Sequence, residues 1–451
     1  MNGIFSGIEN GRFKKIGFFG LGKSNLSLLS TLPLSECETV LRSEKEINRA
    51  HLPKDIGFSR IFSGESAFDG LDEELLICSP SVKRDRQEFS APRARGMLFS
   101  SDAELFFERA GEGDVIAVTG SDGKSTTTTL AASIISKSRR TSLIGNVGVP
   151  MLESLSQHSE VYCAELSSFM LTYLRPKLKR AAITNITPNH LNWHSSFDEY
   201  INVKLSILEN AKQAVLSADD DILFSYLKSH GAFAATSTRL GYGELKKLCK
   251  CKHYFTYEQN YLCKDGVPIV SSADLVRREE YNIKNLLCAM ALADGYAEEE
   301  AVIKAAREFS GLAHRTELFL SHNGIDYVNS SIDTTPERTK NTLDALGKRV
   351  ILILSGRGKG ASYDVLRAPV SRYAECVVIC GEDKEKMCAA LSDLTPCKLA
   401  ASFDEAVKMA VSLAHEGTTV ILSPAATSYD SFKNFEERGK KFKSIVLNTI
   451  K

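Results

Sequence analysis

A short glycine-rich loop between an apolar run and a helix-like segment constrains the fold of this chain most. The loop reads Val118-Thr-Gly-Ser-Asp-Gly-Lys-Ser-Thr126, after the apolar residues 115–118 and before the helix-like residues 127–135. A strand, a tight glycine turn and a helix N-terminus together present backbone N–H groups to phosphate oxygens. We therefore predict a parallel α/β sheet here that carries a nucleoside triphosphate site.

The polar residues of this loop have expected roles. Lys124 would supply a mobile cation for the outer phosphates, and the Ser125 hydroxyl could ligate Mg²⁺. Gly120 and Gly123 stand three positions apart, whereas the glycines of the common phosphate-binding loop stand about five apart. The shortened loop indicates a particular kind of ATPase, and a chance Gly-Lys-Ser turn is the alternative.

The N-terminal segment predicts a second ligand-binding turn. The strand-like run Lys15-Ile-Gly-Phe-Phe19 leads into Gly20-Leu-Gly22-Lys-Ser-Asn25, a dinucleotide-type turn whose third glycine is replaced by Asn25. An NAD site also needs an acidic residue about 20 positions further on to hold the ribose. Arg42 stands in that region instead and suits a phosphate. We predict a diphosphate rather than NAD at this turn, with an empty Rossmann-like turn as the alternative.

The chain is organised as three α/β blocks in series. We predict a Rossmann-like N-terminal domain over residues 1–103, a central P-loop-type ATPase domain with a mostly parallel sheet over 104–310, and a Rossmann-like C-terminal domain over 311–451. The expected strands of the central block end in polar residues, among them Asn146 and Glu165. Ligands bind at the carboxyl ends of strands in open α/β sheets, so these residues should converge around the phosphate loop.

The overall composition excludes several classes of function. Lys and Arg total 56, as do Asp and Glu, so no net charge favours nucleic acid or an anionic membrane. No apolar run approaches the ~20 residues of a membrane span, and the N-terminus lacks a signal-peptide pattern. The 11 cysteines are scattered and odd in number, which argues against a disulfide framework. We therefore expect a reduced, cytoplasmic protein.

Several residues near the expected strand ends could carry chemistry. A carboxylate at Glu165 beside a triphosphate is a natural ligand for Mg²⁺, and a solvated acid is the alternative. His190 follows another strand and could bind metal or transfer a proton, whereas His194 could simply be exposed. Lys204 lies on the apolar face of a helix expected from about residue 197 to 209. By periodicity alone, a snorkelling lysine is favoured there.

The C-terminal block carries two candidate substrate loops. Small and hydroxyl-bearing residues follow an expected strand in Ser423-Pro-Ala-Ala-Thr-Ser428. A glycine loop, Gly356-Arg-Gly-Lys359-Gly360, follows another strand. Arg357 and Lys359 on that loop suit a substrate carboxylate, and two ordinary basic loops are the alternative.

Taken together, these motifs resemble those of the Mur ligase family, ATP-dependent enzymes that form amide bonds in peptidoglycan precursors. The loop Thr119-Gly-Ser-Asp-Gly-Lys-Ser-Thr-Thr127 is similar to the family's TGTNGKST. Further family marks follow in order: Gly145-Asn-Val-Gly148, Glu165-Leu-Ser-Ser, Asn189-His-Leu-Asn, Tyr281-Asn-Ile-Lys-Asn285 and Gly311-Leu-Ala-His-Arg315. The run Asp430-Ser-Phe-Lys-Asn-Phe-Glu-Glu-Arg-Gly439 most resembles the family's D-glutamate-adding members. The resemblance covers essentially the whole chain.

The resemblance implies a role for each candidate residue. The expected ATP contacts are Gly120, Ser121, Asp122, Gly123, Lys124, Ser125, Thr126, Asn282, Asn285, Arg315 and Ser330. The expected contacts to a UDP-linked substrate are Gly22, Lys23, Ser24, Arg42, Asn146 and His190. The expected contacts to D-glutamate are Thr334, Lys359, Ser428 and Phe435. The expected ligands of two Mg²⁺ ions are Ser125, Glu165, His190 and Lys204, the last as a carbamate. Lys124, His190 and Lys204 would be the catalytic residues.

The implied reaction joins D-glutamate to the L-alanyl carboxylate of UDP-N-acetylmuramoyl-L-alanine through an acyl phosphate, with ATP as the phosphoryl donor. The protein would act as a cytoplasmic monomer in cell-wall synthesis. A sister ligase for another amino acid and a weakened relative that only binds nucleotides are the alternatives. Departures from the family pattern bear on them: Asp122 replaces an asparagine, Ser330 an aspartate, and Ile332 a lysine, the last a change associated with clostridia-like enzymes.

Overall fold

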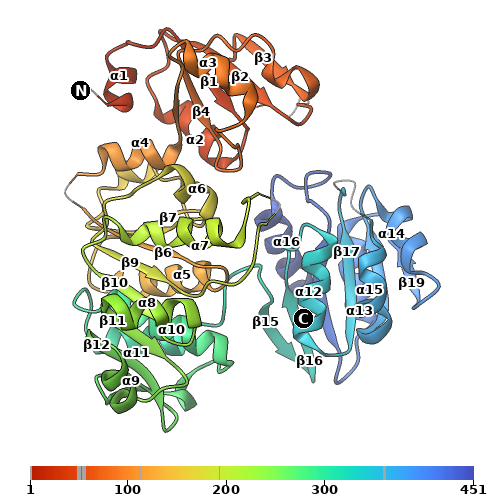
Figure 1. Cartoon of the computed structure of the whole chain (residues 1–451). Helices are drawn as coiled ribbons and strands as arrows, with labels where there is room; N and C mark the ends of the chain where they lie inside the picture. The colour runs from red at the N-terminus through yellow and green to blue at the C-terminus, as the bar shows by residue number, and fades with distance from the viewer. Residues whose placement is uncertain are drawn as a thin grey trace. The chain divides into compact units, whose positions relative to one another are not determined.

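The computed structural model describes residues 3–47, 52, 57–111, 113–191, 193–358 and 362–450. The chain forms two compact units, Met1–Phe309 with two sheets and Ser310–Lys451 with one, and helices cover these mostly parallel sheets (Figure 1). Within the described ranges, no helix combines the length and the apolar character that a membrane crossing requires.

The N-terminal sheet has five parallel strands in the order β3-β2-β1-β4-β5. The strands are β1 (Lys15–Phe19), β2 (Glu38–Ser43), β3 (Arg60–Ser63), β4 (Leu75–Cys78) and β5 (Leu98–Ser100). The helices are α1 (Ile4–Glu9), α2 (Lys23–Thr31), α3 (Ser90–Ala94) and α4 (Asp102–Arg109). β1 and β4 are almost wholly buried, as expected for central parallel strands that are covered on both faces.

The central sheet has nine strands in the order β14-β13-β12-β11-β10-β9-β6-β8-β7. The strands are β6 (Asp114–Thr119), β7 (Thr141–Gly145), β8 (Val161–Glu165), β9 (Arg180–Ile183), β10 (Ala214–Ser217), β11 (Ala232–Ser237), β12 (Cys251–Glu258), β13 (Tyr261–Lys264) and β14 (Val267–Ser271). Neighbours from β7 to β12 are parallel, and β12, β13 and β14 form an antiparallel edge. The mostly parallel central sheet predicted from the sequence is confirmed.

Helices cover both faces of the central sheet. One face packs against α5 (Lys124–Ile135), α10 (Glu280–Ala293) and α11 (Glu299–Glu308). The other face packs against α6 (Ser168–Tyr173), α7 (Phe197–Leu205), α8 (Asp221–His230) and α9 (Tyr242–Leu248). α10 is buried along nearly its whole length, because it lies between α5 and several strands. This packing brings the first turns of α10 to the start of α5.

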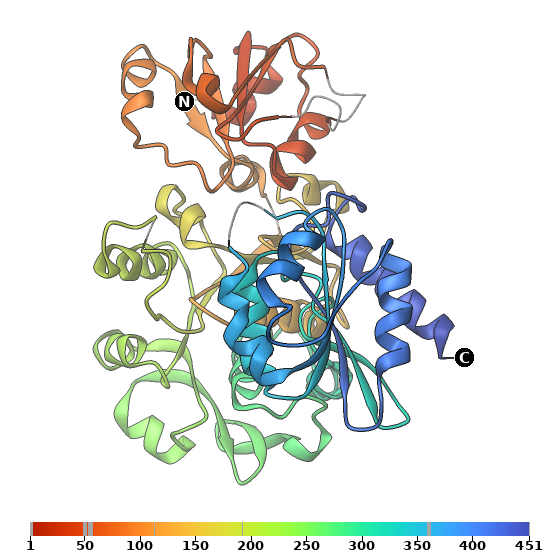
Figure 2. The same cartoon turned by 90° about the vertical axis from the view of Figure 1, so that its right-hand side faces the viewer.

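The C-terminal sheet has six strands in the order β15-β16-β20-β17-β18-β19, all parallel except β15. The strands are β15 (Glu317–His322), β16 (Ile325–Asn329), β17 (Val350–Ser355), β18 (Ala374–Cys380), β19 (Cys397–Leu399) and β20 (Thr419–Ala425). One face packs against α12 (Pro336–Leu346), α13 (Arg367–Tyr373) and α14 (Lys384–Leu391), and the other against α15 (Phe403–Leu413) and α16 (Phe435–Thr449), all in blue tones in Figures 1 and 2. Ser402 caps α15, since its hydroxyl accepts a hydrogen bond from the Glu405 amide.

The N-terminal and central sheets belong to one compact unit. α4 begins at Asp102, so a boundary at residue 103 would fall inside this helix. The Asp102 carboxylate accepts hydrogen bonds from the backbone amides of Met151 (2.8 Å) and Leu152 (2.9 Å), which ties α4 to the central region. The division of the chain into domains at residues 103 and 310 stays a prediction.

Candidate functional site

The phosphate loop lies between β6 and α5, as the sequence predicts. Gly123 caps the N-terminus of α5 with a φ of +78°, and a Cβ there would lie 2.2 Å from Asn285 Oδ1. Gly120 has a φ of +149°, and a Cβ there would lie 1.9 Å from Thr184 Oγ1. Both backbone angle and close approach therefore require glycine at these positions. The turn leaves the first amides of α5 directed at the loop, where an anion can accept from them.

Residues that follow β9 fasten this loop. The Asp122 amide donates to Asn185 Oδ1 (2.9 Å), and Thr184 Oγ1 donates to the Asp122 carbonyl (2.6 Å). Ser121 Oγ donates to the Thr187 carbonyl (2.9 Å). The ammonium of Lys124 donates to the Ser121 carbonyl (2.8 Å) and so folds back over the loop. The loop backbone is thus held in its phosphate-binding shape by its own neighbours.

The N-terminal turns of α10 flank the same loop. Thr127 Oγ1 on α5 donates to Asn285 Oδ1 (3.3 Å), and Asn282 Nδ2 donates to Glu279 Oε2 (3.0 Å). Both asparagines are buried. The structure therefore brings the expected ATP contacts on α10 beside the expected phosphate site, although they stand more than 150 positions further along the chain.

Lys204 on α7 is buried against the phosphate loop. Its side chain is almost fully enclosed, and its ammonium nitrogen donates to the Gly120 carbonyl (2.7 Å). Burial, and next the positive charge of Lys124, lowers the pKa of Lys204 to about 6. The amine is therefore mostly neutral at neutral pH. The snorkelling lysine favoured by periodicity is wrong, because the side chain reaches the loop rather than water.

Glu165 ends β8 close to these groups and carries an unsatisfied oxygen. The residue is 1% exposed, and its Oε1 accepts from Asn146 Nδ2 (2.9 Å). Its Oε2 is buried without a hydrogen-bond partner among the described residues. A buried carboxylate oxygen left in that state is costly, and a bound cation would satisfy it. The solvated acid considered for Glu165 is wrong.

The two histidines after β9 have different environments. His190 lies at the surface and adopts a φ of +55°. Partial enclosure of its ring, and next the positive charge of Lys124, lowers its pKa. His194 is buried, with Nε2 3.0 Å from Ser168 Oγ. The exposed position expected for His194 is wrong, because the segment turns back on itself through a hydrogen bond from the His194 amide to the His190 carbonyl (3.0 Å).

The N-terminal glycine turn presents the start of α2. Gly22 is the N-cap of α2, Ser24 lies in its first turn, and Lys23 Nζ donates to the Gly148 carbonyl of the central region (2.6 Å). Asn25, in the place of a third glycine, is buried and donates through Nδ2 to the Gly20 carbonyl (2.8 Å). Asn25 thus holds the turn in shape through its buried side chain, and the first amides of α2 stay at the turn.

The Arg42 backbone lies at this turn, since its carbonyl accepts from the Gly20 amide (2.7 Å), but its guanidinium is engaged elsewhere. Its side chain is fully buried and pairs with Glu73 through a 2.7 Å contact between Nε and Oε1. Its other nitrogens donate to the carbonyls of Ala67, Asp69 and Gly70. This placement corrects the expectation that Arg42 contacts a diphosphate, because every guanidinium nitrogen already has an internal acceptor. The arginine instead fixes the segment between β3 and β4.

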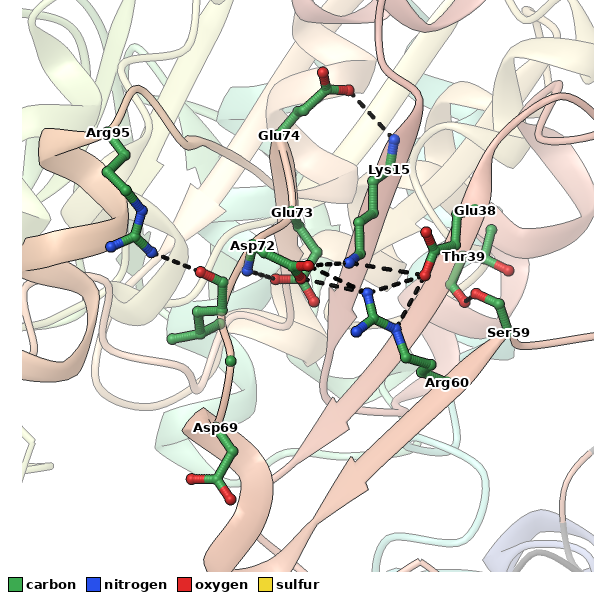
Figure 3. Close-up of polar contacts among 12 residues, drawn as sticks. Lys15, Glu38, Thr39, Ser59, Arg60, Asp69, Asp72, Glu73, Glu74 and Arg95 are labelled. Carbon is green, nitrogen blue, oxygen red and sulfur yellow. Dashed lines mark hydrogen bonds and ion pairs between the residues drawn. The ribbon is translucent and has the colours of Figure 1, made fainter.

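The amino-terminal edge of this sheet carries ion pairs of the exposed kind. Arg60 Nη2 lies 3.0 Å from Glu38 and 3.3 Å from Asp72, and Lys15 contacts the same two carboxylates (Figure 3). The Arg60 and Glu38 side chains are each 41% exposed. Solvent screens such pairs, so they contribute little to stability.

Arg42 and Arg60 therefore offer a matched pair of substitutions. Arg42→Met is expected to destabilise the N-terminal sheet by about 3–5 kcal/mol, because it leaves the buried Glu73 carboxylate unpaired. Arg60→Met is expected to cost about 0–1 kcal/mol. Hydrogen-exchange protection of the β2 amides measures both. The double variant Arg42→Met/Glu73→Leu should recover much of the loss, and equal small effects of both single changes would refute the structural role of Arg42.

The C-terminal unit gathers most of its expected site residues at the carboxyl edge of its sheet. Ser330 follows β16 and is fully buried, with Oγ accepting from the Thr316 amide (3.1 Å). Thr334 lies on the same loop, Ser428 follows β20, and Phe435 begins α16. Arg315 is exposed shortly before β15. Lys359 lies outside the described residues.

Arg438 on α16 organises this edge and was not singled out from the sequence. It is fully buried, and its guanidinium donates to the carbonyls of Ser331, Ser355 and Ala426. Those carbonyls belong to the segments that follow β16, β17 and β20. The signal available in the sequence was an arginine one turn inside a helix after an expected substrate loop, but nothing there shows that it is buried.

Two regions of the chain match known protein domains. The Mur ligase middle domain matches residues 118–293, and the glutamate ligase domain of Mur ligases matches residues 314–426. Over 458 residues and 96% of both chains, the protein is 33% identical to the UDP-N-acetylmuramoylalanine–D-glutamate ligase of Acetivibrio thermocellus. The ligase of the same name from Clostridium botulinum strain Hall is 31% identical, over 96% of this chain and 97% of its own.

The chain belongs to the Mur ligase family. Solved structures show the same fold for this Mur ligase. The UDP-N-acetylmuramate-alanine ligase of Thermotoga maritima aligns with a TM-score of 0.57 and 18% identity, over 96% of this chain and 99% of that chain. A UDP-N-acetylmuramoyl-L-alanyl-D-glutamate–2,6-diaminopimelate ligase aligns with a TM-score of 0.52 and 15% identity, over 84% and 87%. The resemblance drawn from the motifs and the α/β fold class are both confirmed.

Proposed function

We propose that this Mur ligase joins D-glutamate to the L-alanyl carboxylate of UDP-N-acetylmuramoyl-L-alanine, with ATP as the phosphoryl donor. The observation that carries the proposal is the phosphate loop, with Lys124 folded over it and Lys204 buried against its first glycine. The printed names of the two full-length relatives, both D-glutamate ligases, support the choice of amino acid and of sugar-nucleotide.

The two ends of the substrate would bind to different turns of the unit Met1–Phe309. The diphosphate would accept hydrogen bonds from the amides at the start of α2, near Gly22, Lys23 and Ser24. The alanyl carboxylate would lie beside the phosphate loop, within reach of Asn146 and His190. Each end of the substrate would therefore bind at the carboxyl edge of a parallel sheet, where such folds bind ligands.

The chemistry is carboxylate activation. The alanyl carboxylate oxygen attacks the γ-phosphorus of ATP, the bond to the bridging oxygen breaks, and ADP leaves. The amine of D-glutamate then attacks the acyl phosphate carbon, the tetrahedral intermediate expels phosphate, and the nitrogen loses a proton. Lys124 would offset the charge that develops on the phosphoryl oxygens, which is the largest contribution in such transfers.

The residues around the loop fit a divalent cation. Ser125, Glu165, His190 and a carbamylated Lys204 would hold Mg²⁺, and the unpartnered Oε2 of Glu165 is the observation in favour. Among the described residues, no three His, Cys, Asp or Glu side chains form a metal site by themselves. A hydroxyl and a modified lysine would complete the ligand set. When bound, Mg²⁺ would supply electrostatic stabilisation of the transferring phosphoryl group.

Lys204 is suited to become that carbamate. A neutral amine attacks the carbon of CO₂, forms an N–C bond and releases a proton, and the lowered pKa of Lys204 keeps its amine neutral near pH 7. The modification would replace a buried amine by an anion near the positive charge of Lys124. A buried neutral amine would thus become an anionic metal ligand.

The C-terminal residues complete the proposal. Thr334, Lys359, Ser428 and Phe435 would bind D-glutamate, and Arg315 would contact ATP. Ser330 fits this role less well, because its hydroxyl is buried and already accepts from a backbone amide. The proposal also includes two Mg²⁺ ions, a monomeric protein and a cytoplasmic location.

A weakened, nucleotide-binding relative is the competing function, and only Asp122 and Ser330 favour it. Asp122 is exposed, and the hydrogen bonds that hold the loop in shape are made by its backbone amide and carbonyl. The change from asparagine therefore leaves the geometry of the loop intact.

Phosphate release by the purified protein tests the function. With Mg-ATP and UDP-N-acetylmuramoyl-L-alanine, we expect turnover on adding D-glutamate and at least about 10²-fold less with L-glutamate, L-lysine or glycine, because a polar site penalises a misplaced charge strongly. Turnover with another amino acid alone would move this Mur ligase to a sister activity. ATP binding without turnover for any of them would support the weakened relative.

A further inference from the structure

A series of contacts leads from the N-terminal glycine turn to His190, in the segment after β9, within the unit Met1–Phe309. It begins at Ser79, directly after β4, where a Cβ on Gly20 would lie 2.7 Å from Ser79 Oγ. That hydroxyl is buried and lacks a hydrogen-bond partner among the described residues. A buried hydroxyl in that state, at the edge of a glycine turn, is suited to a ligand oxygen.

The contacts continue through Trp193. Its indole Nε1 donates to the Ser81 carbonyl (3.4 Å), and the ammonium of Lys83 lies 5.1 Å from the centre of its ring. Phe169 packs against the indole with ring centres 4.6 Å apart, and against His190 with ring centres 4.9 Å apart. The segment after β4 therefore touches the loop after β9 through one indole ring.

This position corresponds to the middle of the proposed substrate. The diphosphate would lie at the turn that Ser79 borders, and the alanyl carboxylate near His190. The N-acetylmuramoyl sugar connects the two, so it must pass the surface that lies between them. An indole offers a flat apolar face to the C–H groups of a sugar ring, and its neighbours can serve the polar groups.

The contact between Lys83 and Trp193 is weak enough to be replaced by a contact of Lys83 with a phosphate. An ammonium over an aromatic face gains less than an ammonium that donates a charge-assisted hydrogen bond to a phosphate. Lys83 lies four positions after Ser79, which borders the glycine turn, so a diphosphate bound there would compete with the indole for Lys83. The move would uncover the indole face.

We propose that Lys83 and Trp193 are substrate-binding residues for the middle of the sugar-nucleotide. On binding, the ammonium of Lys83 turns from the indole to the diphosphate, and the freed face of Trp193 packs against the N-acetylmuramoyl ring. This inference rests on the proposed function for the identity of the sugar-nucleotide. It does not depend on which amino acid is added.

The chain itself provides the probe, because Trp193 is its single tryptophan. Titration of the full-length protein with UDP-N-acetylmuramoyl-L-alanine should change the intensity or position of the tryptophan emission, with saturation near the KM for that substrate. Mg-ATP alone should change the emission less than the sugar-nucleotide does. Unchanged emission at a substrate concentration that saturates turnover would overturn the proposal.

Substitutions supply an independent readout. Trp193→Ala and Lys83→Met should each raise the KM for the sugar-nucleotide about 10-fold or more, with the KM for ATP changed less than about 2-fold. Trp193→Phe should recover most of the loss, since a ring remains. Lys304→Met is the matched control, because Lys304 is 61% exposed on α11. A KM for the sugar-nucleotide that stays at the wild-type value in Trp193→Ala would overturn the proposal.

The outcomes distinguish a failure of this inference from a failure of the proposed function. An emission change without turnover on D-glutamate would leave this inference standing and refute the proposed amino acid. Turnover on D-glutamate with no emission change would confirm the function and refute the inference.

Discussion

Replacing Lys124 by alanine should lower kcat for phosphate release about 10³-fold or more. The side chain folds over the phosphate loop and would lie beside the transferring γ-phosphoryl group, whose negative charge increases in the transition state. A cation that acts mainly in the transition state lowers kcat and kcat/KM together when it is removed. Steady-state kinetics with D-glutamate measures both quantities.

A lysine just after the C-terminus of α5 provides the control for this substitution. Lys137 follows α5, and its side chain is 34% exposed and pairs with Glu308 at 3.3 Å. Lys137→Ala removes the same charge from the protein at a distance from the loop, so its kcat should stay within about 2-fold of wild type. A kcat for Lys124→Ala within 10-fold of wild type would contradict the assigned role.

Replacing Lys204 by alanine should lower kcat about 10²-fold or more, although Lys204 is proposed to contact the metal rather than the substrate. The substitution would remove the proposed carbamate and leave the proposed cation with fewer anionic ligands. The Mg²⁺ concentration needed for half-maximal activity should rise as well. Lys304→Ala, at an exposed site on α11, provides the control.

The proposed carbamate on Lys204 can be tested directly and should depend on pH in a defined way. In ¹³CO₂-equilibrated buffer, a ¹³C carbamate signal should appear in wild-type protein and be missing in Lys204→Ala. Because the pKa of the amine is lowered to about 6, the neutral form dominates above that pH, and the signal should decline as the pH falls through about 6. A lysine with the usual pKa would carbamylate only at much higher pH. Full activity of CO₂-depleted wild-type protein would refute the carbamate.

The phosphate loop was predictable because its signals are local. The glycines at positions 120 and 123, both with positive φ, follow an apolar strand and precede a helix. All of these signals lie close together in the sequence. The strands β1, β4, β6 and β8 were predictable for the same reason, since each is a short buried apolar run. The strands β10 to β14 were not predicted, because several of them alternate in burial or lie at an exposed edge.

The positions of buried polar side chains could not be predicted from local signals. The sequence alone allows a solvent-exposed or ligand-facing side chain at Arg42, His194 and Lys204. The structure buries all three against residues distant in the sequence. Glu73 for Arg42 and Gly120 for Lys204 lie 31 and 84 positions away. Only the fold brings such partners together. The same reason explains why the contact between Lys83 and Trp193 was not foreseen.

The central claim is that the alanyl carboxylate is activated by phosphorylation before D-glutamate attacks it. The most direct test uses UDP-N-acetylmuramoyl-L-alanine with ¹⁸O in both oxygens of its alanyl carboxylate, together with Mg-ATP, D-glutamate and the purified protein. We predict that the released phosphate contains one ¹⁸O atom for each amide bond formed, and that mass spectrometry detects the glutamyl product. Amide formation with unlabelled phosphate would contradict the acyl phosphate, and phosphate release without the glutamyl product would contradict the ligase.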